Sequence, residues 1–238
     1  MNFSNSTPLT QAVSDGLLPR NAADVKAPRP APEEMRPLSE EEANRLLEMA
    51  CGERFEALYV LAIGTGLRRG ELLGLRWDDV DLERSTLRVG RALVREGGRH
   101  TIGETKTRRG RRQINLTPRM VNALKTHRKN QLEEKMKLAG LYKDHGLIFA
   151  TGVGTPVNPE NLVKRSFKPL LKKSGLPEIR FHDLRHTCAT IYLGRSIHPK
   201  FVQELLGHAT IAMTLDTYSH YLPSMGDQAA AAMEAAIG

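Results

Sequence analysis

The chain has 238 residues, and 35 lysines and arginines against 27 aspartates and glutamates give it a net charge of 35 − 27 = +8. Its 40% hydrophobic content suits one or two domains with a sizeable core, no stretch approaches the ~18 apolar residues of a membrane helix, and MNFSNSTPLT lacks the features of a signal peptide. The two cysteines, Cys51 and Cys188, have no metal-type spacing and suit the reducing cytoplasm, and the basic excess indicates a polyanionic partner.

Prolines punctuate the start of the chain, which predicts a leader and linker over residues 1–37 with one short helix near Leu9–Leu18. Ser39 and Glu42 then form the Ser-x-x-Glu pattern of a capping box, which predicts the start of a helix. Two more helices are predicted, one through Phe55, Leu58, Tyr59 and Leu61 and one beginning near Arg69.

From Asp81 the apolar period shifts towards two, which predicts strands. The candidates LRV, ALV and RQINL are separated by glycines, and helices return after them. The expected fold is therefore mainly α-helical with a small antiparallel β-sheet inserted after the third helix, an α+β class, and an Ala-rich tail over residues 223–238 forms a short helix. The later helices are predicted over Pro118–Lys137, from Pro159 to Gly175, over Asp183–Leu193 and over Pro199–Leu206.

The positive charge is concentrated in one segment. Between Arg84 and Arg112 there are ten basic and two acidic residues, a sum of 10 − 2 = +8, while the rest of the chain sums to 25 − 25 = 0. Such a segment is expected on a face that neutralises phosphates. A solvated, arginine-rich hairpin explains the charge equally well.

Reactive side chains occur in four segments, of which GTGLRRGELLGLRW is the first. Arg68 and Glu71 are three residues apart on a predicted helix, so the carboxylate would orient the guanidinium for contact with a phosphate; a surface ion pair is the simpler alternative. In the second, ETKTRRGRRQINL, Lys106 is either a point charge or proton donor near phosphates or an ordinary solvated lysine.

The third segment, FHDLRHT, places His182 and Arg185 on one face at a helix start, where the helix dipole favours anions. His182 and His186 have an i, i+4 spacing seen in metal sites, but without a nearby Cys or a suitably spaced carboxylate we predict no metal. The fourth, ELLGHATIAMTLDTYSHY, carries His208 and Tyr218 and taken alone resembles half of a helix-turn-helix.

Taken together, these residues supply what attack on a phosphodiester requires. The added charge on the non-bridging oxygens must be neutralised, and the reaction needs a nucleophile and a proton for the leaving alkoxide. The full set, in chain order, is Arg68, Lys106, His182, Arg185, His208 and Tyr218.

The order and wording of these segments resemble the catalytic domain of the tyrosine recombinases, the phage integrase family of phages and mobile elements. The resemblance is carried by TGLRRGELLGLRW, TKTRRGRRQINL, FHDLRHT, LLGH and TLDTYSH, and it covers Ser39 to about Leu222. It implies a site-specific recombinase with a catalytic domain over residues 38–222.

The resemblance implies a role for each residue. Tyr218 attacks the scissile phosphate and forms a 3′-phosphotyrosine link, while Arg68, Arg185 and His208 hold the non-bridging oxygens. Tyr221 is the competing nucleophile, but the spacing from His208 and the Ser-His that follows favour Tyr218.

Three further residues complete the implied mechanism. Lys106 protonates the leaving oxygen, His182 manages the proton of Tyr218, and Glu71 supports the site. The family uses no metal, and because a phosphoester bond is kept throughout, no ATP is needed. The implied partners are double-stranded DNA and further copies of the chain, which form a tetramer on DNA. The chain can be a monomer in solution before it binds DNA. The DNA-contacting residues predicted in the basic segment are Arg108, Arg109, Arg111 and Arg112.

One departure from the family pattern affects the whole-protein function. Family members carry a helical core-binding domain before the catalytic one, and here residues 1–37 resemble only the end of such a domain. A truncated, non-enzymatic DNA-binding remnant is therefore one alternative, and a type IB topoisomerase, which shares the same constellation, is another. Tyr218 together with both arginines argues against the remnant, and the wording around LLGH and TLDTYSH favours the recombinase.

Overall fold

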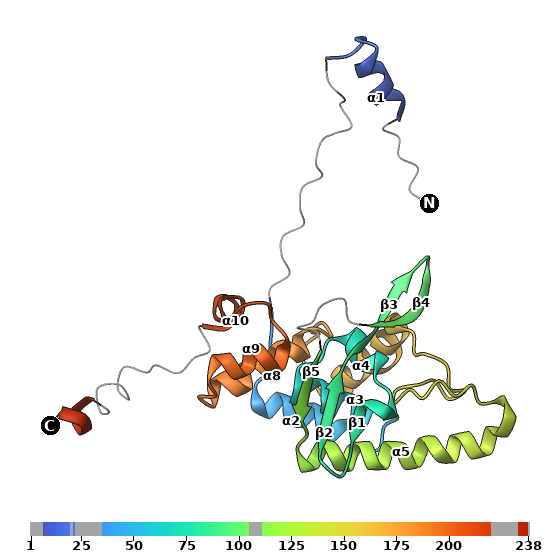
Figure 1. The fold of residues 1–238 in the computed structure, drawn as a ribbon. Coiled ribbons are helices and arrows are strands. Elements are labelled where there is room, and N and C mark those ends of the chain that lie inside the picture. The colour runs from blue at the N-terminus through green and yellow to red at the C-terminus, as the bar shows by residue number, and fades with distance from the viewer. Residues whose placement is uncertain (1–6, 20, 22–34, 105–110, 220–232, 238) are drawn as a thin grey trace. The chain divides into compact units, whose positions relative to one another are not determined.

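A computed structural model describes residues 7–19, 21, 35–104, 111–219 and 233–237 (Figure 1). The chain divides into two units, residues 1–34 and residues 35–238. The first contains helix α1, Thr7–Ser14, at the predicted short helix. Residues 233–237 are helical, within the predicted tail helix. No helix among the described residues is long and apolar enough to cross a membrane.

The predicted capping box begins the second unit. The Ser39 hydroxyl accepts the Glu42 N–H at 3.1 Å, and the Glu42 carboxylate accepts the Ser39 N–H at 3.0 Å, so two of the unpaired donors at the start of α2, Glu40–Met49, are satisfied. Helix α3, Glu56–Thr65, is almost wholly buried and ends at Gly66 in the left-handed conformation, φ 62°. Helix α4, Arg69–Gly74, follows directly.

The predicted sheet is two separate antiparallel sheets. Strand order in the larger is β1-β2-β5, and β3 pairs with β4 in a hairpin. The alternating pattern identified β2, β3 and β5 but missed β1, which has only two residues, and β4, whose sequence RHTIGE holds one large apolar residue and so shows no alternation. The strand bounds are Val80–Asp81 (β1), Thr86–Val89 (β2), Arg91–Glu96 (β3), Arg99–Glu104 (β4) and Arg112–Asn115 (β5).

The four later helices that the sequence predicts are confirmed with one change, and a helix over Ile211–Tyr218 is present in addition. The helix predicted from Pro159 to Gly175 is interrupted by a π-helical segment, Val163–Phe167. Short 3₁₀ turns occupy Trp77–Asp79 and Ala139–Leu141. The helices are α5 (Pro118–Leu138), α6 (Pro159–Leu162), α7 (Lys168–Lys173), α8 (Asp183–Gly194), α9 (Pro199–Leu206) and α10 (Ile211–Tyr218).

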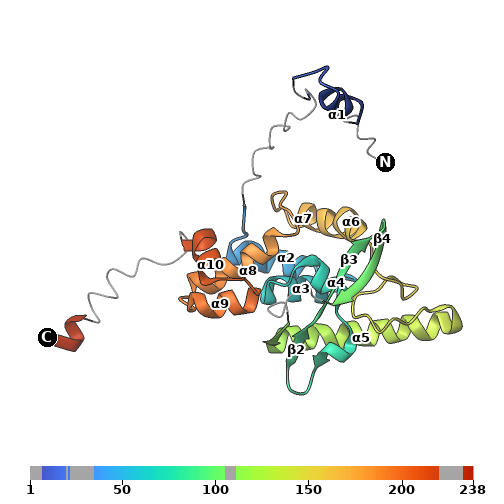
Figure 2. The same ribbon diagram turned by 45° about the horizontal axis from the view of Figure 1, so that its top comes forward.

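Helix α3 is the centre of the second unit, between α5 and α8. Figures 1 and 2 both show α8, α9 and α10 grouped at one end, with the β3–β4 hairpin beside α4. A small apolar cluster joins these three helices, and it includes Leu193, Val202 and the ring of Tyr218. This packing brings residues of α8, α9 and α10 together at one end of the second unit.

Two glycines let α4 approach the hairpin at backbone distance. A methyl group at Gly74 would lie 2.8 Å from Ala92 Cα and 2.9 Å from its carbonyl carbon, and one at Gly70 would lie 2.8 Å from the Leu93 carbonyl oxygen. Because the atoms in the way belong to the main chain of β3, they cannot move aside as a side chain would. The hairpin is thus seated directly on the helix that follows Arg68.

We predict that Gly74→Ala destabilises the protein by about 1–3 kcal/mol, because the added methyl overpacks this contact. Gly194→Ala is the matched control: Gly194 is also the last residue of its helix and has open space around it, so alanine should be neutral or stabilise by up to about 1 kcal/mol. Urea unfolding of the two variants measures both effects. Equal stabilities for the two variants would contradict the close approach.

Candidate active site

A buried carboxylate organises the first part of the site. Glu71 accepts the Arg68 main-chain N–H at 2.9 Å and the Arg68 guanidinium at 3.0 Å, as the i, i+3 spacing predicted. The Arg68 side chain nevertheless remains 44% exposed, while that of Glu71 is 5% exposed. The ion pair therefore leaves much of the guanidinium open to an anion from solvent.

Arg112, which the sequence analysis placed among the DNA-contacting residues, also binds Glu71. Its Nη1 and Nη2 donate to the two carboxylate oxygens of Glu71 at 3.2 and 2.9 Å, and its side chain is only 8% exposed. The two-residue period of a strand indicates this burial. Arg112 stands two residues before the buried Ile114, so both side chains point to the inner face of β5.

Arg185 lies deeper, with 3% of its surface exposed. It donates to the carbonyl oxygens of Gly66 at 2.8 Å and Leu206 at 2.7 Å. Burial, together with the charge of Arg68, lowers its pKa to about 10, so it remains a cation at neutral pH. Arg185 thereby ties the end of α3 and the end of α9 to α8.

His208 follows the left-handed Gly207 at the end of α9. Its Nδ1 lies 2.9 Å from the Thr214 hydroxyl, and its carbonyl accepts the Gln203 side-chain amide at 3.0 Å. Burial lowers the pKa of His208 to about 4, and the charges of Arg185 and Arg68 act in the same direction. A neutral ring is therefore held in fixed orientation within the field of both arginines.

Tyr218 is 1% exposed, and its hydroxyl shares a 2.7 Å hydrogen bond with His186 Nδ1. The Tyr218 ring is nearly parallel to that of His208, with centroids 6.5 Å apart. The sequence analysis predicted that His182 handles the proton of Tyr218, and it considered His186 only for the i, i+4 spacing of a metal site. His182 packs edge-on against His186, with ring centroids 5.0 Å apart, so the residue in contact with the phenol is one turn further along α8.

The remaining predicted residues divide between the surface and the undescribed part of the chain. Arg111, predicted to contact DNA, lies on the surface, where its side chain is 60% exposed and pairs with Glu104. Outside the described residues are Lys106, Arg108, Arg109 and Tyr221. The structure thus brings together Arg68, Glu71, His182, Arg185, His208 and Tyr218 through the Arg68–Glu71 pair, the bonds of Arg185 to Gly66 and Leu206, and the ring contacts of His182, His186, His208 and Tyr218.

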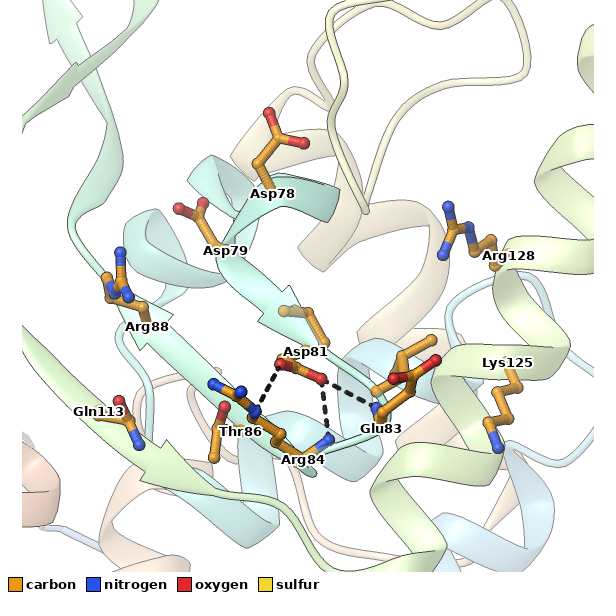
Figure 3. A pocket seen from close by; sticks show the side chains of 12 residues that line it. Asp78, Asp79, Asp81, Glu83, Arg84, Thr86, Arg88, Gln113, Lys125 and Arg128 are labelled. Carbon is orange, nitrogen blue, oxygen red and sulfur yellow. Dashed lines mark hydrogen bonds and ion pairs between the residues drawn. The ribbon is translucent and has the colours of Figure 1, made fainter.

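Two other features of the structure bear on alternative kinds of site. Among the described residues no group of three His, Cys, Asp or Glu side chains is arranged to hold a metal ion. A polar groove of about 950 Å³ lies between β1, β2 and α5 (Figure 3). It is not lined by any of the residues that cluster around Glu71, Arg185 and Tyr218. Its carboxylate Asp81 accepts the main-chain N–H groups of Glu83 and Arg84 at 3.0 and 2.8 Å, which stabilises the β1–β2 turn.

Comparison with known proteins identifies the family. Residues 36–225 match the Phage integrase family. The chain belongs to this family.

The relatives and structural neighbours agree with the family match. A tyrosine recombinase XerC-like protein of Caldanaerobacter subterraneus subsp. tengcongensis is 37% identical over 89% of this chain and 59% of its own length. The Tn1549 transposon integrase in complex with transposon right end DNA is 27% identical, with a TM-score of 0.70 over 98% of this chain and 77% of that one. The XerA recombinase has a TM-score of 0.62 at 26% identity, over 89% and 67% of the two chains.

The family match agrees with the mainly α-helical fold and the order of motifs. The chain spans less than two thirds of the length of its curated relatives: 59% of the Caldanaerobacter protein and 63% of an integrase of Saccharopolyspora erythraea.

The neutral state of His186 gives a testable pH dependence. Burial, reinforced by the charges of His182 and Arg180, lowers its pKa from 6.5 to about 4. Between these values the unfolded chain binds a proton that the folded protein does not, so the free energy of unfolding falls as the pH drops. His186→Gln removes this contribution. The stability advantage of the wild type over His186→Gln should therefore shrink from neutral pH to about pH 4, measured by urea unfolding; a pH-independent difference would contradict it.

Proposed function

We propose that this chain is the strand-cleaving and strand-joining part of a site-specific DNA recombinase, with Tyr218 as nucleophile. The observation that carries the proposal is the convergence of Arg68, Arg185, His208 and Tyr218. Arg185 donates to the carbonyls two residues before Arg68 and two residues before His208, and the ring of His208 lies parallel to that of Tyr218. Two guanidiniums and an imidazole suit the dianionic, five-coordinate phosphorus of a phosphoryl transfer.

The proposed step balances without an external energy source. The Tyr218 Oη forms a bond to phosphorus while the bond from phosphorus to the 5′ oxygen breaks, which leaves a 3′-phosphotyrosine and a 5′ hydroxyl. Lys106 supplies the proton of the leaving oxygen, and the phenolic proton passes to an imidazole or to water. One phosphoester replaces another, so attack by the 5′ hydroxyl of a second strand reverses the step with no ATP or metal ion.

The buried phenol adds a conformational requirement. At 1% exposure and bonded to His186, the Tyr218 hydroxyl cannot touch a DNA phosphate. Attack therefore requires the end of α10 or the Tyr218 side chain to move and to exchange His186 for the scissile phosphate. His182, one turn before His186, is the imidazole that we place next to the hydroxyl after this movement.

We also propose the partners and the organisation of the chain. Support for double-stranded DNA as substrate comes from the Tn1549 integrase, which was solved with DNA, and from the charge of residues 84–112. Strand exchange needs four cleaved strands, so we propose a tetramer on DNA. Within each copy, residues 38–222 form the catalytic domain, residues 1–37 a leader and linker, and residues 223–238 a tail helix, and the protein acts in the cytoplasm.

Covalent trapping tests the chemistry. On a duplex nicked close to the cleavage point, the short 5′ fragment diffuses away and the phosphotyrosine accumulates. We expect wild-type protein to form a covalent adduct that denaturing gel electrophoresis detects, and Tyr218→Phe to form none, because it lacks the attacking oxygen. The buried Tyr59→Phe is the matched control and should form adduct at the wild-type level.

The outcomes separate the alternative functions. DNA binding without any wild-type adduct would support a non-enzymatic remnant. Relaxation of supercoiled plasmid at protein concentrations where the chain is monomeric would support a topoisomerase. An adduct that persists in Tyr218→Phe would move the nucleophile to another residue, with Tyr221 the first to test.

The salt dependence of binding tests the DNA-facing segment. Replacing Arg108, Arg109 and Arg111 by alanine should reduce the slope of log K against log salt by about 0.9 for each phosphate that the variant no longer neutralises. The matched control removes three exposed lysines of α5, Lys125, Lys129 and Lys137, and should leave the slope near its wild-type value. Fluorescence anisotropy over a range of salt concentrations measures both. Equal effects of the two triple variants would remove the arginine segment from the DNA face.

A further inference from the structure

Within the described part of the basic segment, Arg112 stands out because all three nitrogens of its guanidinium donate to acceptors of the protein itself. Its Nε donates to the Leu205 carbonyl oxygen at 2.6 Å, in addition to the two bonds to Glu71. With 8% of its side chain exposed, its guanidinium has little surface to offer a phosphate. Its charge therefore acts inside the protein.

At one end, Arg112 acts on Arg68 through a shared carboxylate. Each oxygen of Glu71 accepts one bond from Arg68 and one from Arg112: Oε1 binds both guanidiniums, and Oε2 binds the Arg68 N–H and Arg112 Nη2. Burial alone would raise the pKa of Glu71, but the hydrogen bond and charge of Arg112, with those of Arg68, hold it below its usual value. Glu71 is thus ionised and fixed from two sides, and it fixes Arg68 in turn.

At the other end, Arg112 acts on the segment that carries His208. The Leu205 carbonyl accepts Arg112, and the next carbonyl, Leu206, accepts Arg185 at 2.7 Å. Gly207 then reverses the chain direction and His208 follows. Two guanidiniums on successive carbonyls therefore hold the end of α9 in place, and with it the segment that carries the His208 ring.

On the basis of the strand-cleavage function proposed above, we propose that Arg112 is a positioning residue that sets the spacing between Arg68 and His208. The proposed mechanism places both residues on the non-bridging oxygens of one phosphate. The Arg112 guanidinium on β5 binds Glu71, which holds Arg68, and also binds the Leu205 carbonyl, which lies three residues before His208. Arg112 does not touch DNA. It holds Arg68 and His208, which come from different parts of the fold, at the separation that contact with a single phosphate requires.

The test compares two arginines that bind the same kinds of acceptor, a glutamate and a main-chain carbonyl. Arg54 also donates to both oxygens of a glutamate, Glu134, and to a carbonyl, that of Ala150, but it lies outside the site. Arg112→Lys and Arg54→Lys each keep the charge and lose the planar fork that binds several acceptors at once. The readouts are the rate of adduct formation at saturating nicked duplex, the DNA affinity with its salt slope, and the melting temperature.

We expect Arg112→Lys to slow adduct formation on the order of 100-fold, the effect of a small misplacement of phosphate ligands, with affinity and salt slope near wild type. Arg54→Lys should keep the wild-type rate. Glu71→Gln should slow the reaction as well, and the double variant with Arg112→Lys should be little slower than the worse single variant, because both act through one network.

Four results overturn the proposal. A wild-type rate in Arg112→Lys removes the positioning role. A further variant, Arg112→Ala, removes the charge as well, and a loss of DNA affinity and salt slope in it that matches its loss of rate makes Arg112 a phosphate contact. If Arg54→Lys and Arg112→Lys lower the melting temperature equally and slow adduct formation equally, the effect is one of general stability. Absence of any wild-type adduct overturns the proposed function and this role together, whereas adduct formation with unaffected Arg112 variants overturns this role alone.

Discussion

A single buried carboxylate holds the site together. Glu71 lies between two guanidiniums, one at the start of its own helix and one on β5, and both are within 3.2 Å of its oxygens. A charge at this depth is tolerated only with partners that satisfy its oxygens, and removing one partner of such a group typically costs about 3–5 kcal/mol. Helix α4, strand β5 and the end of α9 therefore have a strong energetic reason to meet at one place.

Around this centre the electrostatics favour a bound anion. Arg68, Arg112 and Arg185 lie close enough to influence one another's surroundings, and Glu71 is the carboxylate that opposes them directly. The three imidazoles of His182, His186 and His208 respond by having lowered pKa values, so they add hydrogen-bonding groups without adding charge. A bound phosphodiester would add negative charge at this place and would favour protonation of these rings.

The sequence was sufficient where a local rule determines the structure. The Ser39 capping box, the helix Pro199–Leu206 and the alternation in β2 and β5 all depend on neighbouring residues, and each was predicted correctly. The site was predictable as a set because its residues lie in motifs of known order. The burial of Arg112 and the contact between His186 and Tyr218 were not predicted, since they depend on how α9 and α10 pack, and charge alone cannot distinguish an internal arginine from a DNA-facing one.

The acceptors on α9 are main-chain carbonyls, and this affects how the site tolerates mutation. Any amino acid at positions 205 and 206 still presents a carbonyl oxygen to Arg112 and Arg185, so leucine is required there for packing rather than for alignment. The alignment is vulnerable instead to insertions or deletions in α9, which would rotate those oxygens away by about 100° for each residue. The length of this helix, more than its composition, is then what preserves the geometry of the site.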